Sequence, residues 1–103
     1  MPFSQSYRDF VMEQLEPILP AVHARNMFGG VGIYSAGIFF ALIADDVLYF
    51  HTDDTNRQDY QQSGLRQWGK NYYEVPIAVL EDAGELRLWA EKAVISASKK
   101  KKK

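Results

Sequence analysis

The sequence predicts an α+β fold in which one antiparallel sheet has helices packed on a single face. Strand-like and helix-like segments occur in separate runs, which is the pattern of this class. The chain has 103 residues, enough for one domain but too few for two separate cores. Apolar runs between residues 22 and 51 are short and separated by tight turns, as in successive hairpins. The predicted order of elements is α-β-β-β(-β)-α-β-α.

The first helix is predicted to begin after Ser4, whose hydroxyl can accept a hydrogen bond from the first turn as an N-cap. Pro17 and Pro20 are expected to end it, because proline lacks the backbone N–H that a helix needs. One face would carry the apolar residues Tyr7, Phe10, Val11, Leu15 and Ile18.

Four strands are predicted to follow as closely spaced hairpins. Their alternation of apolar and small residues is interrupted by turn residues at 35–37 and at Asp45-Asp46. The expected strands are residues 22–28, 29–34, 38–44 and 47–51.

A short polar helix is predicted next, capped by Asp53 or Asp54 and continuing to Ser63. Gly64 follows at the position where a helix commonly ends in a left-handed residue. Residues 65–70 would then form a loop.

Residues 71–75 are predicted to form a strand, because aromatic and β-branched side chains favour one. Pro76 would stop this strand or confine it to a sheet edge. The last helix would begin at Asp82 or Gly84 and complete a single domain of residues 1–98. Its apolar face would carry Leu86, Trp89, Ala90, Ala93, Val94 and Ala97.

Composition places the chain among globular proteins. A hydrophobic content of 47%, with 14% aromatic residues, is ample for a packed core. No apolar run approaches the roughly 20 residues of a membrane span, and the N-terminus lacks the regions of a signal peptide. There is no cysteine, which excludes disulfides and thiolate chemistry and predicts a reducing, cytoplasmic location.

Charge is distributed unevenly along the chain. Five of the 12 basic residues are Lys99–Lys103, so residues 1–98 hold the other seven together with all 13 acidic ones. An acidic body argues against direct nucleic-acid binding by the folded part. Lys99–Lys103 is predicted to be a disordered tail, because like charges repel one another.

No catalytic, cofactor or metal site is predicted. His23 and His51 have no partners at the spacing of a metal site or catalytic pair, so strand-end or surface positions are expected. Acidic pairs occur only in turns or just before helices, where carboxylates form turns and cap. These pairs are Asp45-Asp46, Asp53-Asp54 and Glu81-Asp82.

The glycines of the segment Arg25–Gly32 raise the question of a phosphate loop. Such a loop needs a following helix whose N-terminus meets the phosphate, whereas here a strand follows. We therefore expect Gly29, Gly30 and Gly32 to bend or bulge a hairpin.

Aromatic residues are numerous for one small core. Tyr72 and Tyr73 would point to opposite faces of their strand. If Phe40 and Tyr49 also pointed outward, an exposed aromatic strip typical of a partner-binding face would result. The alternative is that lysine stems and helices cover these rings.

An ordered set of motifs resembles the N-terminal domain of the TfoX/Sxy family of bacterial competence regulators, over roughly residues 5–95. The resemblance implies an α+β, secretion-chaperone-like fold with no catalytic residues to transfer. The full-length regulators carry a second, helical domain, so it also implies a stand-alone protein. The motifs are Arg25-x-Met27-Phe28-Gly29-Gly30-x-Gly32-Ile33-Tyr34, Phe40-Ala41-Leu42-Ile43, Asn56-Arg57 with Gly64, Tyr72-Tyr73-Glu74-Val75-Pro76, Val79-Leu80-Glu81-Asp82 and Leu88-Trp89-Ala90.

The expected function is that of a non-enzymatic regulatory module that binds another protein, linked to bacterial transcription or competence regulation. Transcription machinery is one such partner, and self-association through an open sheet edge is a further expectation. The candidate contact residues are Arg25, Met27, Phe28, Gly29, Gly30, Tyr72, Tyr73 and Glu74.

Two alternatives remain open at this point. One is a small-ligand-binding protein or uncharacterised enzyme with a cleft near Arg25, Tyr72 and Glu74. The weaker one is nucleic-acid binding through the Lys99–Lys103 tail, which would be steeply salt-dependent.

Overall fold

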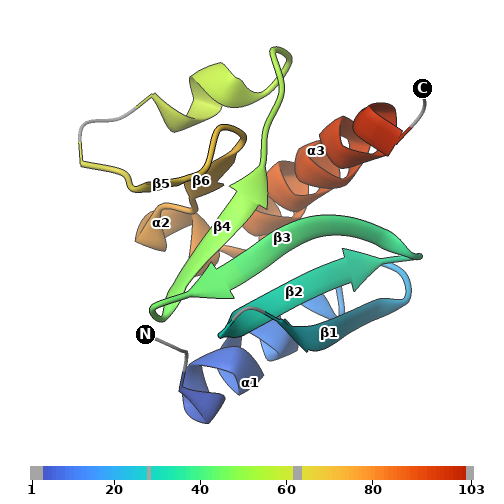
Figure 1. The fold of residues 1–103 in the computed structure, drawn as a ribbon, viewed down its shortest axis with the longest axis vertical. Helices are drawn as coiled ribbons and strands as arrows, with labels where there is room; N and C mark the ends of the chain where they lie inside the picture. The colour runs from blue at the N-terminus through green and yellow to red at the C-terminus, as the bar shows by residue number, and fades with distance from the viewer. Residues whose placement is uncertain (1–3, 28, 62–63, 102–103) are drawn as a thin grey trace.

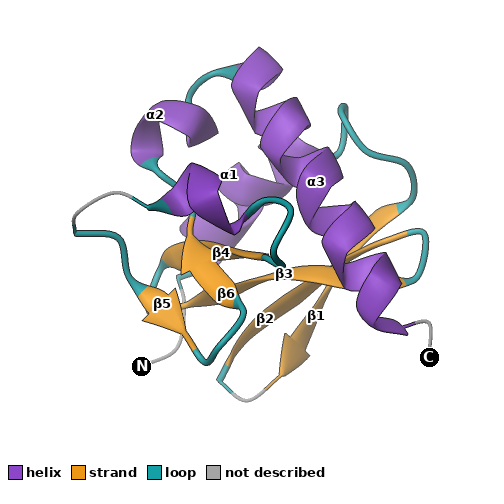
Figure 2. Ribbon diagram, turned by 90° about the horizontal axis from the view of Figure 1, so that it is seen from above, coloured by secondary structure: helices purple, strands orange, loops and turns teal. Residues whose placement is uncertain are grey.

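A single antiparallel sheet with helices on one face makes up the structure, a computed structural model (Figures 1 and 2). The structure describes residues 4–27, 29–61 and 64–101. The strands are β1 (Val22–Met27), β2 (Gly30–Ser35), β3 (Ile38–Ala44), β4 (Val47–His51), β5 (Gln67–Trp68) and β6 (Tyr72–Glu74). The helices are α1 (Gln5–Leu15), α2 (Ile77–Leu80), α3 (Ala83–Lys101) and a 3-10 turn, η1 (Arg57–Tyr60).

The strand order across the sheet is β1-β2-β3-β4-β6-β5, and every neighbouring pair is antiparallel. The described α-helices, α1, α2 and α3, lie on the same side of the sheet, and no helix of the described residues lies on the opposite side (Figure 2). This arrangement confirms the predicted α+β class. β3 and β4 have the predicted bounds, and β1 and β2 differ from the prediction at their ends by about one residue, with Phe28 outside the described residues.

The segment between β4 and α3 departs from the prediction. The polar helix predicted to reach Ser63 is only η1, because Asp53 caps a tight turn instead: its Oδ1 accepts from Thr55 N and Thr55 Oγ1, at 2.9 and 2.6 Å. Ser63 itself lies outside the described residues.

The predicted loop of residues 65–70 contains β5, a strand too short to show alternation. Because β5 pairs with β6, the strand before Pro76 is not at an edge. Pro76 stops that strand and begins α2, a four-residue helix that the sequence analysis missed.

Side-chain caps set where the two long helices begin. Ser4 Oγ accepts from the backbone N–H of Tyr7 at 3.3 Å, as predicted for an N-cap. Asp82 Oδ1 accepts from the N–H groups of Gly84 and Glu85, at 3.0 and 3.1 Å, and so begins α3. Ser4 is also tied to the β3–β4 turn, since Asp46 Oδ1 accepts from its N–H at 2.6 Å.

The core lies between α3, α1 and the helix-side face of the sheet. The rings of Phe40 and Phe50 meet there with centroids 5.8 Å apart, and Tyr60 packs edge-on against Trp89 at 4.7 Å. The predicted apolar face of α1 is correct for Val11 and Leu15 but wrong for Phe10, which is 39% exposed. On α3 the buried apolar positions are Leu86, Ala90, Ala93 and Ala97, and Ser96 is buried beside them.

α3 continues to Lys101. Lys99–Lys101, predicted as part of a disordered tail, are therefore helical, and Lys102 and Lys103 lie outside the described residues. Lysine has good helix propensity, and positive charge is favourable at a helix C-terminus. Lys99 Nζ also lies 3.3 Å from the Asp53 carboxylate.

A β-bulge shifts the register in which β2 pairs with β3 by one residue. Ile33 pairs with Ala41, but its neighbour Tyr34 pairs with Phe39, so Phe40 is an extra residue on β3. As a result Phe40 and Ala41 are both buried in the core, while Phe39 lies on the other face. The bulge was expected within the glycine segment and occurs instead just after it.

The glycines at the start of β2 permit close approach of neighbouring groups. Gly29 has φ +75° in the β1–β2 turn, a conformation that glycine adopts without strain. A Cβ atom on Gly30 would collide with the carbonyl oxygen of Ile43, and one on Gly32 would lie 2.7 Å from Met27 Cε. The segment bends a hairpin, as predicted. Its glycines also let the β3 backbone approach Gly30 and the Met27 side chain approach Gly32.

Gly30→Ala is expected to lower the free energy of unfolding by about 1–3 kcal/mol, because the added methyl group must displace the β3 backbone. Chemical denaturation would measure this change. Gly84→Ala is the matched control, since an added Cβ there meets only Asp82 Oδ1 at an ordinary 3.5 Å and alanine favours the helix. Equal stabilities of the two variants would contradict the close approach at Gly30.

Candidate functional site

The helix-free side of the sheet, called here the open face, is covered by its own side chains. Strand register places these residues on one side, because every second residue of a strand points the same way. They are His23, Arg25, Met27, Gly30, Gly32, Tyr34, Phe39, Leu42, Ala44, Val47, Tyr49, His51, Arg66, Trp68, Tyr72 and Glu74.

Aromatic rings form a continuous row across the open face. His23 stacks on Tyr34 with centroids 5.1 Å apart and an interplanar angle of 3°. Tyr34 contacts Phe39 at 5.2 Å, and Phe39 contacts Tyr72 at 5.8 Å. Trp68 completes the row, edge-on to Tyr72 at 6.1 Å. The row therefore contains rings from β1, β2, β3, β6 and β5. The contact between Phe39 and Tyr72 joins β3 to β6, although β4 lies between these strands in the sheet.

An exposed aromatic strip, one of the two alternatives left open by the sequence, does exist, but with a different membership. Phe40, a conditional member of that strip, lies in the core because of the bulge. Tyr49 does lie on the open face, where it is only 5% exposed. Tyr72 and Tyr73 alternate as predicted: the Tyr73 ring lies on the helix side, 5.9 Å from that of Tyr60.

A cavity of about 240 Å³ opens on this face between the β1–β2 hairpin and β5. Its lining is mostly apolar. Leu42 is among the buried lining residues, at 6% exposed, whereas Trp68 remains 46% exposed. The lining residues are Met27, Gly29, Gly30, Val31, Phe39, Leu42, Ile43, Ala44, Asp45 and Trp68.

The structure brings together part of the predicted contact set. Met27, Gly29 and Gly30 line the cavity, and Arg25 is exposed on the same face of β1. Phe28 lies outside the described residues. Sequence reasoning missed Trp68, Leu42 and Phe39, which complete the cavity. An isolated tryptophan in a predicted loop was the available signal for the first of these.

Tyr72 and Glu74 belong to the open face but not to this cavity. In the sheet order, β2, β3 and β4 lie between β6 and Arg25 on β1. The cleft near Arg25, Tyr72 and Glu74 stays a prediction.

Polar groups on the β5–β6 side are held in place. Glu74 Oε1 accepts from the N–H of Arg66 at 2.8 Å, and the Arg66 side chain hydrogen-bonds to the Tyr49 hydroxyl. Burial raises the pKa of Tyr49, and Arg66 opposes that rise. Burial, assisted by Tyr34, raises the pKa of Tyr72 to about 12.

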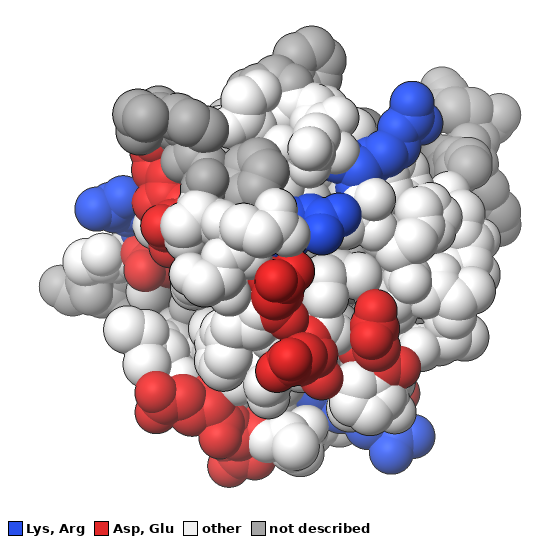
Figure 3. Space-filling view, turned by 90° about the horizontal axis from the view of Figure 1, so that it is seen from below, with Lys and Arg blue, Asp and Glu red and all other residues white. Residues whose placement is uncertain are grey.

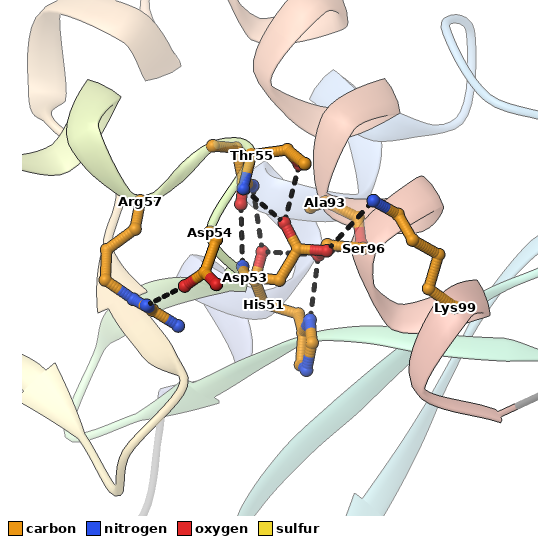
Figure 4. Close-up of polar contacts among 9 residues, drawn as sticks. His51, Asp53, Asp54, Thr55, Arg57, Ala93, Ser96 and Lys99 are labelled. Atoms are coloured by element: carbon orange, nitrogen blue, oxygen red, sulfur yellow. Dashed lines mark hydrogen bonds and ion pairs between the residues drawn. The ribbon is translucent and has the colours of Figure 1, made fainter. Parts of the chain in front are cut away.

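A second polar cluster lies where β4 ends against α3 (Figure 4). His51 Nδ1 is 2.8 Å from Ser96 Oγ, which is also 3.1 Å from the His51 carbonyl oxygen and 3.0 Å from that of Ala93. His51 is at a strand end, as predicted, but it is 2% exposed rather than on the surface. Sequence reasoning did not pair it with Ser96, because 45 residues separate them.

This histidine–serine contact has the geometry of a structural link. Ser96 is 1% exposed, so its Oγ is almost completely shielded from solvent. The single hydroxyl proton of Ser96 can be donated to the carbonyl oxygen of His51 or of Ala93. Ser96 Oγ then acts as the acceptor toward His51, which favours the tautomer with the proton on Nδ1. The nearby Asp53 carboxylate is engaged by Thr55 and Lys99 (Figure 4). The contact fastens α3 to the end of β4.

Carboxylates and histidines do not converge elsewhere. Within residues 4–27, 29–61 and 64–101, no group of three or more could hold a metal ion. The acidic pairs occupy turns and caps as predicted, with positive φ at both Asp45 and Asp46. No helix of the described chain is long and apolar enough to cross a membrane.

Tyr72→Phe is expected to reduce the slope with which the free energy of unfolding falls as pH rises in the alkaline range. The pKa of Tyr72 is raised from 10.0 to about 12 in the folded state. The folded chain therefore retains a proton that the unfolded chain loses above about pH 10, and stability falls as pH rises through this window. Denaturant unfolding between about pH 9 and 11 would measure the difference in slope. Identical slopes for the wild type and the variant would contradict burial of this hydroxyl.

The chain matches a known family along most of its length. Residues 13–97 match the family model described as the TfoX N-terminal domain, a segment that begins within α1, includes all six strands and ends within α3. A comparison with curated proteins gives no match. The resemblance drawn from the motifs is confirmed, and the chain belongs to the TfoX N-terminal domain family.

Proposed function

We propose that this chain is a non-enzymatic, cytoplasmic regulatory module that binds another protein through the open face. The observation that carries the proposal is the aromatic row with its apolar cavity, left uncovered by any helix (Figure 2). Trp68 is 46% exposed on a two-residue strand. Tryptophan is enriched among the residues that dominate binding energy at protein interfaces.

The size of the cavity on the open face suits one inserted side chain better than a whole metabolite. Sites for small ligands usually measure about 300–1,000 Å³ and enclose most of the ligand. The cavity between Met27 and Trp68 measures about 240 Å³, which suits one large side chain inserted from a partner. Apolar rings around it provide further contact area.

Two further observations support a regulatory role without catalysis. Membership of the TfoX N-terminal domain family supports a link to transcription or competence regulation in bacteria. The histidine–serine contact, which resembles part of a catalytic pair, joins β4 to α3, and its two residues are 2% and 1% exposed. A partner in the transcription machinery follows as part of the proposal.

Trp68→Ala is expected to weaken binding of the physiological partner at least about tenfold, the scale of a hot-spot residue. The partner would be captured from the source organism with the wild-type chain, and its Kd then measured by calorimetry. Leu88→Ala is the control, because Leu88 is 54% exposed on α3, away from the open face. Equal losses for both variants, or no loss for Trp68→Ala, would rule out the open face as the site.

A further inference from the structure

We propose that the segment seated on the open face is an acidic peptide carrying one large apolar side chain. This inference rests on the proposed function and specifies the chemistry of the partner. The apolar side chain would enter the cavity beside Trp68. Carboxylates flanking it would pair with Arg25 and Arg66 at the two borders of the face and with Lys70 beside it.

The first support is the distribution of unpaired positive charge. Five of the described basic side chains have a carboxylate partner, in the pairs Arg8–Asp9, Arg57–Asp54, Arg87–Glu91, Lys92–Asp59 and Lys99–Asp53. Among residues 4–27, 29–61 and 64–99, Arg25, Arg66 and Lys70 have no such ion pair. The basic side chains without carboxylate partners are therefore those of the open face and its adjoining turn.

The second support is where these cations lie relative to the cavity. Arg25 is two residues before Met27 on the same face of β1, and Met27 lines one wall. Arg66 is two residues before Trp68, which also lines the cavity, and Lys70 follows in the β5–β6 turn. An extended segment crossing the cavity would thus meet positive charge at both ends.

The third support is the acidity of other surfaces. Residues 1–98 carry 13 acidic and seven basic side chains. Asp and Glu side chains gather on the side of the molecule shown in Figure 3, where fewer Lys and Arg side chains are seen. An acidic segment would be repelled there. The open face carries Arg25 and Arg66 together with Glu74, and Asp45 lines the cavity, so the cationic borders of this face are the favourable docking surface for such a segment.

A single-stranded nucleic acid is also anionic, but the ring geometry fits it less well. Bases bind by stacking on free ring faces. Here one face of the Tyr34 ring is stacked against His23. The Tyr72 ring makes edge contacts with Trp68 and His51, at interplanar angles of 85° and 81°. These rings are therefore already engaged with one another. One apolar cavity suits a single side chain better than a run of bases.

Fluorescence anisotropy with synthetic peptides of equal length would test the inference. The probe is a labelled peptide with Leu-Phe flanked by Asp and Glu. The comparison peptides replace the acidic residues with Lys, or Leu-Phe with Gly-Ser, and a single-stranded oligonucleotide is the fourth ligand. We expect saturable binding of the acidic apolar peptide alone, weakened by salt.

Charge reversal would locate the binding. Arg25→Glu combined with Lys70→Glu is expected to raise the Kd of the acidic apolar peptide about tenfold or more. Arg87→Glu is the control, since Arg87 is exposed on α3 and pairs with Glu91. Thermal unfolding would verify that each variant is folded. Equal affinities of the two charge-reversal variants, or tighter binding of the lysine peptide or oligonucleotide, would overturn the inference.

A photo-crosslinker placed at position 68 would separate this inference from the proposed function. An acidic segment with an apolar residue, crosslinked in the captured partner, would support both. A crosslinked basic or neutral segment would overturn the charge assignment while leaving the open face as the protein-binding site. If position 68 crosslinks to no protein although the chain captures its partner, both proposals fail.

Discussion

Close contact between α3 and the central strands is the constraint on which the rest of the structure depends. The buried positions of α3 are small except for Leu86, with Ala90, Ala93 and Ala97 facing the sheet. Alanine lets the helix axis approach β3 and β4, so the large side chains Phe40 and Phe50 fill the space from the sheet side. The Ser96–His51 contact fixes the far end of the helix. Because the described helices all pack on one face of the sheet, the apolar residues of the other face must be shielded from water by other side chains.

The open face meets that requirement with side chains that pack on one another. The ring contacts from His23 to Trp68 bury Leu42 and Tyr49 to 6% and 5% exposure without any covering helix. Such a surface is stable in water and still offers apolar area to a partner, because the row itself is only partly buried. Structural and binding roles therefore coincide in the same rings.

Most of the fold could be predicted from the sequence, because its elements follow local rules. Proline positions, the Ser4 and Asp82 caps and the Asp45-Asp46 turn each act within a few residues. The prediction was wrong where tertiary pairing decides the outcome, as in β5, which exists only through its hydrogen bonds to β6. The candidate site was predicted in part for the same reason. Residues of the β1–β2 hairpin were found by their motif, whereas Trp68 reaches the cavity from a strand far along the chain.

The extra residue in β3 determines which side chains of that strand lie in the core and which lie on the open face. Phe40 shifts the phase of alternation, so that Phe39 lies outward and both Phe40 and Ala41 lie inward. Removing one residue here would restore a regular ladder and exchange the faces of every position on one side of it. The aromatic row and the core would then lose members together. Within this family, the length of this strand should therefore be constrained more tightly than the identity of most of its residues.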